Sequence, residues 1–198
     1  MAKRIVSDRC FGAVIDVQDF FLAQLGSRPR RTRIETNLAN FARLLAYFRI
    51  PMIATLERPL HRKGRLPERL KTLAEVAHVF EKEFFDLTKE KEIADHISGL
   101  KRTQALVTGC ETDVCVLQSC LGLIDLGYEV FVVEDLLFSS SRDVDAAIAR
   151  MKHEGAVFLT YKTLFYELVE AVQGDRHTDQ MTRTYGPFPD DLPDAARR

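Results

Sequence analysis

Short apolar segments alternate with segments of helical periodicity along the chain, and this alternation constrains the fold more than any other feature. The apolar segments lie at residues 12–16, 51–55, 76–80, 105–107, 128–133 and 156–159. Parallel strands need a crossover connection, usually a helix, and such connections are right-handed. The sequence therefore predicts an α/β fold: a single-domain Rossmann-like three-layer sandwich with a central six-stranded, mostly parallel sheet.

The length of 198 residues, with 46% hydrophobic residues, suits one well-buried domain and is too short for two ordinary ones. From Gly174 onward the chain becomes polar and carries Pro187, Pro189 and Pro193. Such a composition is typical of an extended arm or a disordered tail. We expect one folded domain over residues 1–173 and a polar C-terminal arm or tail over 174–198.

The charge pattern argues against two classes of partner. The formal net charge is −1, and charges of both signs are interspersed, so no basic field for nucleic acid is expected. No stretch approaches the apolar length of a membrane span, and no export signal is evident. We expect a cytoplasmic protein with a small-molecule substrate, without nucleic-acid or membrane partners, and with its four cysteines as free thiols.

Residues 107–116 close an apolar strand and open a helix around Cys115. Gly109 permits a sharp turn, and Thr112 is a candidate N-cap for the helix. Cys115 would then lie in the first helical turn, where the helix dipole favours a thiolate. A cysteine in such a place is either a small buried hydrophobic residue or a nucleophile.

The pattern from Gly109 to Val116 resembles the nucleophile turn of the isochorismatase-like cysteine hydrolases. That family uses an Asp, a Lys and a Cys that follow three different strands, and this chain has Asp16 and Lys82 in the matching order upstream of Cys115. Taken alone, Asp16 could cap a turn and Lys82 could be solvated. The resemblance covers about residues 10–172 and favours the branch of isochorismatase domain-containing proteins.

The resemblance implies roles for particular residues. Cys115 would be the nucleophile, Asp16 the general base and later acid, and Lys82 the cation that favours thiolate. The backbone N–H groups of Glu111 and Cys115, presented by a cis peptide after Cys110, would bind the oxyanion. The substrate would be a carbonyl compound, an amide above all, cleaved through a thioester. Further residues are expected to contact the substrate: Gln18, Phe21 and Phe85.

Two departures from the family pattern bear on substrate and metal. Asp19 and Phe20 replace the usual residues beside the first motif, which leaves the substrate open. Nicotinamidase-type relatives place an Asp-x-His metal pair after the second strand, whereas this chain carries residues 57–61 as Glu-Arg-Pro-Leu-His. We therefore predict no metal and no cofactor.

Two alternatives stay open on the same scaffold. One is protonation of a vinyl ether by Asp16, which needs no cysteine. The other is a non-enzymatic oligomeric binding or thiol-sensing protein. Family members commonly associate, so a homo-oligomer, a dimer or larger, is expected.

The thiols of the nucleophile segment should differ in reactivity. Lys82 and the helix N-terminus are expected to lower the pKa of Cys115 below the free value of about 8.5, against the opposing charge of Asp16. Cys110 and Cys120 lack these neighbours. We therefore expect Cys115 to react alone.

Overall fold

The structure, a computed structural model, describes residues 2–169 and contains one six-stranded sheet whose paired strands all run parallel. The spatial order is β3-β2-β1-β4-β5-β6. The strands are β1 (Cys10–Ile15), β2 (Met52–Glu57), β3 (Ala77–Lys82), β4 (Gln104–Gly109), β5 (Glu129–Leu137) and β6 (Val157–Leu159). The predicted α/β architecture is confirmed, while the predicted tail at 174–198 lies outside the described residues.

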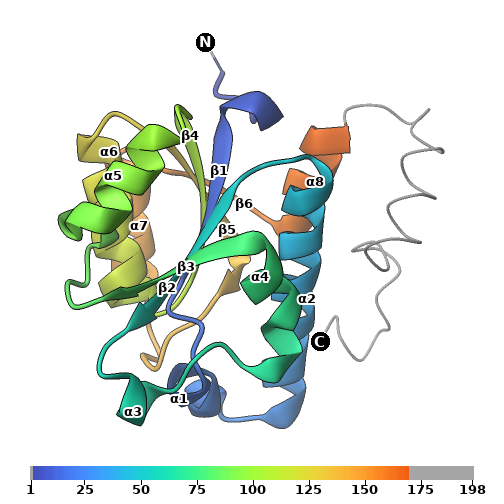
Figure 1. The fold of residues 1–198 in the computed structure, drawn as a ribbon, viewed down its shortest axis with the longest axis vertical. Coiled ribbons are helices and arrows are strands. Elements are labelled where there is room, and N and C mark those ends of the chain that lie inside the picture. The colour runs from blue at the N-terminus through green and yellow to red at the C-terminus, as the bar shows by residue number, and fades with distance from the viewer. Residues whose placement is uncertain (1, 170–198) are drawn as a thin grey trace.

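Helices cover both faces of the sheet, which makes three layers. The α-helices are α1 (Asp19–Leu22), α2 (Arg28–Tyr47), α3 (Leu60–Lys63), α4 (Lys71–Val76), α5 (Lys91–Gly99), α6 (Leu117–Asp125), α7 (Asp145–His153) and α8 (Tyr161–Val169). In Figure 1, α2, α4 and α8 lie on one face and α5, α6 and α7 on the other. Within residues 2–169, none of these helices has both the length and the apolar character required to cross a bilayer.

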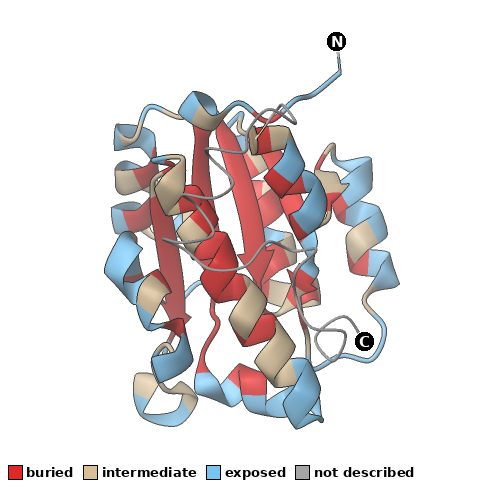
Figure 2. Cartoon of the chain, turned by 90° about the vertical axis from the view of Figure 1, so that its right-hand side faces the viewer, coloured by how far each residue is buried: buried red, intermediate tan, exposed pale blue. Residues whose placement is uncertain are grey.

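The central strand β1 shows why the fold forms. Its residues are all buried, and they alternate between two hydrophobic cores. Cys10 and Val14 face the core under α2 and α8, whereas Phe11, Ala13 and Ile15 face the core under α5, α6 and α7. Figure 2 shows strands buried along their length between helices that are buried on one side. A strand covered on both faces reads as a continuous apolar run, which is why the sequence revealed it.

The carboxyl ends of the strands meet at one edge of the sheet, and the strand order reverses between the neighbouring strands β1 and β4. Ligands of open α/β sheets bind outside the sheet at such a switch point. Gly109, the last residue of β4, lies opposite Ile15 with φ +122°. A Cβ at this position would lie 2.1 Å from the Ile15 carbonyl oxygen, so only glycine permits this approach.

Candidate active site

The structure brings together the three side chains that the sequence singled out, at the carboxyl edge of the sheet. Lys82 Nζ lies 2.7 Å from Asp16 Oδ2, and it donates to Cys115 Sγ at 3.5 Å. Asp16 directly follows β1, Lys82 ends β3, and Cys115 lies in the segment after β4; all three are buried. A buried ammonium thus lies between a carboxylate and a thiol and contacts both.

Asp16 is the first residue after β1 and adopts the left-handed conformation, with φ 50°, which is uncommon outside glycine. Its N–H donates to the Thr55 carbonyl at 3.1 Å, and the Thr55 hydroxyl donates to Asp16 Oδ1 at 2.8 Å. Burial raises the pKa of Asp16 above its ordinary value, against the opposing effects of Lys82 and Thr55. Its carboxylate therefore holds a proton more readily than an exposed aspartate does.

Lys82 ends β3 with its side chain fully buried. Its ammonium also donates to the Phe84 carbonyl at 3.1 Å. Burial alone would lower the pKa of Lys82, but the charges of Asp16 and Cys115 raise it above the ordinary value. Lys82 accordingly stays positive at the centre of the site.

Cys115 lies in a π-helical turn, Thr112–Val116, that leads into α6. The Glu111 carbonyl accepts from the N–H groups of Val114 at 3.1 Å and Val116 at 3.0 Å, and the Cys110–Glu111 peptide is cis, as the resemblance implies. The predicted N-cap role of Thr112 is wrong, because its hydroxyl donates to the Phe138 carbonyl at 3.0 Å. The wide turn uses the Glu111 carbonyl in place of a side-chain cap.

Serine side chains from the segment after β5 fix the nucleophile turn. The Glu111 carboxylate accepts from the hydroxyls of Ser139 at 2.9 Å and Ser140 at 2.6 Å, and the Asp113 carboxylate accepts from Ser139 at 2.5 Å and Ser141 at 2.6 Å. Burial would raise the pKa of Asp113, but the bonds from Ser139 and Ser141 lower it overall. These hydrogen bonds to the carboxylates of Glu111 and Asp113 hold the turn, and with it the backbone N–H groups of the turn, in place.

The expected low pKa of Cys115 is wrong. Burial raises the pKa of this thiol above its ordinary value, Asp16 and Glu57 raise it further, and the Lys82 ammonium only partly offsets them. Burial also raises the pKa of Cys110, and that of Cys120 to about 12. Cys115 is thus a thiol at rest, and its polar neighbours, more than its acidity, distinguish it from the other two.

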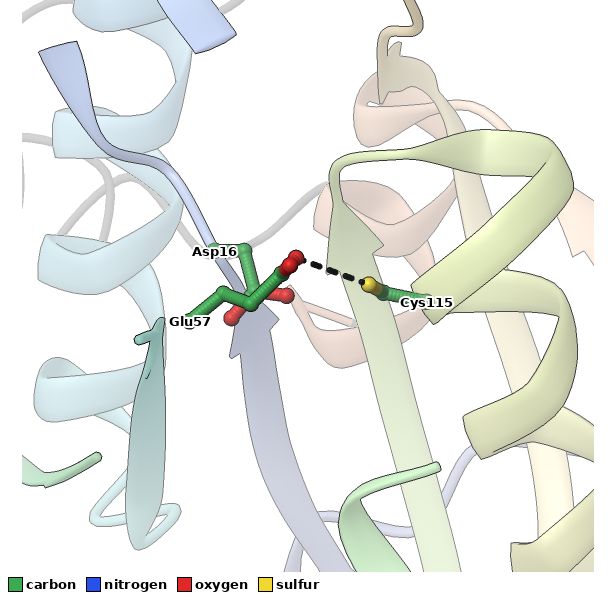
Figure 3. A group of neighbouring side chains, drawn as sticks. All are labelled: Asp16, Glu57 and Cys115. Carbon is green, nitrogen blue, oxygen red and sulfur yellow. Dashed lines mark hydrogen bonds between the residues drawn. The ribbon is translucent and has the colours of Figure 1, made fainter. Parts of the chain in front are cut away.

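Glu57 is a residue of the site that sequence reasoning missed. It ends β2, and its Oε2 accepts from Cys115 Sγ at 3.4 Å, as Figure 3 shows. Its Oε1 forms an ion pair with Lys63 of α3. The signal was present, because Glu57 is a charged residue at the end of a strand beside β1, as Asp16 is at the end of β1 itself.

The residues predicted to contact substrate have different surroundings. Gln18 is buried and hydrogen-bonds the backbone of Glu57. Phe21 is buried in the core beside α2, with Lys63 Nζ 5.7 Å from its ring centroid. Phe85 is 47% exposed, and its carbonyl accepts from Ser119 at 3.3 Å. Gln18 and Phe21 support the walls of the site, and substrate contact by all three stays a prediction.

A cation could in principle be held by Asp16, Glu57 and Cys115, whose ligand atoms lie within 4.8 Å of one another. Each carboxylate, however, already pairs with an ammonium, Asp16 with Lys82 and Glu57 with Lys63. A metal ion would have to displace or repel both positive charges. The donor set therefore fits a metal poorly.

Comparison with known sequences identifies the family. A family model described as the isochorismatase domain matches residues 13–163. The isochorismatase family protein 2A of Dictyostelium discoideum is 30% identical over 191 residues, which are 89% of each chain.

Several solved structures share the fold. The MAR1 ribonuclease of Caenorhabditis elegans has a TM-score of 0.80 at 25% identity, covering 96% of this chain and 98% of that one. YcaC of Pseudomonas aeruginosa, solved with hexane-2,5-diol and covalent acrylamide, has a TM-score of 0.84 at 22% identity. The match covers 100% of this chain and 96% of that one. YcaC of Escherichia coli, an octameric hydrolase of unknown specificity, has a TM-score of 0.84 at 21% identity. The match covers 100% of this chain and 95% of that one. The nicotinamidase of Staphylococcus aureus has a TM-score of 0.67 at 20% identity. The match covers 76% of this chain and 98% of that one. With the family model spanning most of its length, this chain belongs to the isochorismatase family of hydrolases.

Proposed function

We propose that this protein hydrolyses the C–N bond of a small amide, with Cys115 as nucleophile, Asp16 as general base and acid, and Lys82 as the cation between them. The observation that carries the proposal is the position of the Lys82 ammonium, 2.7 Å from Asp16 Oδ2 and 3.5 Å from Cys115 Sγ. A buried ammonium so placed can stabilise negative charge on either partner as a proton moves between them.

The first step begins from the thiol, since burial raises the pKa of Cys115. Asp16, one of whose carboxylate oxygens lies within 4.8 Å of the sulfur, accepts the S–H proton as sulfur attacks the carbonyl carbon. The S–C bond forms, and the π electrons of the carbonyl move to its oxygen. The N–H groups of Glu111 and Cys115 bind this oxyanion. The raised pKa of Asp16 suits it to accept a proton near neutral pH.

The second and third steps return the proton. Asp16 protonates the nitrogen as the C–N bond breaks, which releases ammonia or an amine and leaves a thioester on Cys115. Asp16 then accepts a proton from water, whose oxygen attacks the thioester. The C–S bond breaks, the acid leaves, and Asp16 returns the proton to sulfur. The sum is amide plus water to acid plus amine.

Charge favours a small-molecule substrate over nucleic acid, despite the likeness to a ribonuclease structure. The formal net charge is −1, and two carboxylates lie at the thiol, whereas phosphate backbones require a positive surface. A homo-oligomer is part of the proposal, supported by the octameric hydrolase that shares the fold. Sizing by light scattering tests this part.

The test of the mechanism is intact-mass analysis after rapid mixing with a panel of primary amides. The expected result is a thioester on Cys115 in the wild type, and no adduct or turnover in Cys115→Ala or in Asp16→Asn, which lacks the base of the first step. Cys120→Ala is the matched control, because it removes a buried thiol five residues further along the same segment. Turnover by Cys115→Ala would overturn the proposal in favour of acid catalysis by Asp16. The absence of any adduct and any turnover in the wild type would favour a binding protein.

A further inference from the structure

A second carboxylate lies at the nucleophile, and the mechanism above does not use it. Glu57 Oε2 accepts from Cys115 Sγ at 3.4 Å, while Lys82 Nζ lies 3.5 Å from the same sulfur. Figure 3 shows Asp16 and Glu57 next to each other across from Cys115, with the hydrogen bond between the thiol and Glu57 drawn as a dashed line. At rest the thiol donates to Glu57, whereas the proposed mechanism transfers the thiol proton to Asp16, so that mechanism gives Glu57 no role.

The side chain of Glu57 is held firmly. Gln18 clamps its backbone from both sides, accepting from the Glu57 N–H at 2.8 Å and donating to the Glu57 carbonyl at 3.1 Å. Gln18 also donates to the Gly64 carbonyl at 2.8 Å, which ties the end of β2 to the chain after α3. Lys63 of α3 pairs with Oε1 and leaves Oε2 for the thiol. Glu57 is 8% exposed, so Oε2 has little water to bind.

Attack of sulfur on the carbonyl carbon, before the C–N bond breaks, removes the hydrogen-bond donor of Glu57 Oε2. Once the Cys115 proton has moved to Asp16 and sulfur has bonded to the acyl carbon, no S–H remains to donate. A buried carboxylate oxygen without a donor is unfavourable, so a substrate that supplies one is preferred. The atoms attached to the acyl carbon lie nearest, because that carbon is bonded to Sγ. An amide N–H can replace the lost donor, whereas an ester oxygen cannot.

We propose that Glu57 is a specificity-determining residue that accepts an N–H from a neutral carboxamide or ureido substrate and repels a carboxylate next to the reacting carbon. This inference rests on the proposed function, since it takes Cys115 as the nucleophile. Sites built to bind a donor reject analogues that lack it, because the site is then left with an unpaired polar group. Glu57 thus selects for N–H groups and against negative charge at the same point.

The experiment compares two pairs of thiol reagents on the full chain. Acrylamide and methyl acrylate differ in the N–H donor, and iodoacetamide and iodoacetate differ in charge. With the acrylates, sulfur bonds to the β-carbon and the thiol proton goes to the α-carbon; with the iodo compounds, iodide leaves and the proton passes to solvent. Rates at Cys115 are measured by peptide mass spectrometry and divided by the rates of free cysteine.

The wild type is expected to favour each amide at least tenfold over its partner after this correction. Glu57→Gln should reduce the preference for iodoacetamide over iodoacetate at least fivefold. Lys63→Met should increase that preference, because Glu57 loses the ammonium that offsets its charge. Glu81→Gln is the matched control, since Glu81 lies on the neighbouring strand β3 and pairs with Arg58, away from the thiol.

Three outcomes would overturn the inference. One is a wild type without amide preference, and another is an unchanged preference in Glu57→Gln. The third applies if Glu57→Gln fails to fold: a lower preference for iodoacetamide over iodoacetate in Lys63→Met than in the wild type then contradicts the inference. Labelling of Cys110 or Cys120 in place of Cys115 would defeat the proposed nucleophile as well, which distinguishes failure of the proposed function from failure of the Glu57 assignment.

Discussion

Glu57 and Lys82 are partners in the parallel register of β2 and β3, so a carboxylate and an ammonium end two neighbouring strands. Both then contact Cys115 Sγ, at 3.4 Å and 3.5 Å. Since β2 also adjoins β1, which ends just before Asp16, the electrostatics of the site depend on the sheet as a whole.

Removing one partner of the buried ion pair between Lys82 and Asp16 should reduce the stability of the protein strongly. Lys82→Met leaves the Asp16 carboxylate buried without its cation, and we expect a loss of about 3–5 kcal/mol in the free energy of unfolding. Asp16→Asn in the Lys82→Met background should recover part of that loss, because no isolated charge remains. Urea unfolding of the two single variants and the double variant measures this, and additive losses would contradict the coupling.

The pH dependence of Cys115 labelling follows from the directions of two pKa shifts. Asp16 accepts the thiol proton only when ionised, so the rate should fall as pH falls through its pKa, which lies above the ordinary 3.8. The Lys82 ammonium must keep its proton for the reaction. Deprotonation of Lys82 should therefore reduce the rate only above the ordinary lysine pKa of 10.5, because the pKa of Lys82 is raised.

Acrylamide labelling between pH 4 and pH 11 gives the profile. Asp16→Asn should abolish the acid limb and leave a rate that simply rises with pH as the thiol ionises. A wild-type profile identical to that of Asp16→Asn would show that Asp16 does not act as the base.

Gly109 should not tolerate a side chain. Its φ of +122° and the 2.1 Å approach of an added Cβ to the Ile15 carbonyl oxygen require β1 and β4 to separate. We expect Gly109→Ala to cost about 3–5 kcal/mol of stability, at the upper end for single substitutions. Gly127→Ala is the control, with φ +86° but nothing within 4 Å of the added atom, and should cost about 1–2 kcal/mol. Equal melting temperatures for the two variants would contradict this account of crowding.

Metal removal should leave the reaction unchanged, because ammonium groups already neutralise both carboxylates of the site. Overnight dialysis against a chelator, followed by acrylamide labelling of Cys115, tests this. A chelated protein that loses activity and regains it with zinc would reverse the assignment, and elemental analysis of the purified protein would then identify the ion.

The sequence predicted the sheet well because its central strands are buried on both faces and therefore read as apolar runs. β3 was predicted to end at Phe80, but the strand continues through Glu81 and Lys82. β3 is an edge strand with exposed positions, so hydrophobicity alone could not mark its end. Asp16 was easier to find, because it directly follows a fully buried strand.

The site was predictable in its members and less so in its electrostatics. The helix dipole suggested an acidic Cys115, but the degree of burial and the carboxylates of Asp16 and Glu57 come from segments far apart in sequence, and they reverse the shift. The Thr112 prediction failed for a related reason. Its hydroxyl bonds to Phe138, 26 residues away, in a contact that local sequence does not encode.

The short helix α3 reaches the site through the Lys63–Glu57 ion pair, and α1 packs against α3; neither helix takes part in the sheet. Changes in their length or composition would leave the strand register, and with it the spacing of Asp16, Lys82 and Cys115, as it is. Natural variation in these two segments can therefore change the surroundings of Glu57 at little cost to the arrangement of the other three side chains. An evolving lineage could vary these surroundings many times while inheriting one unaltered geometry.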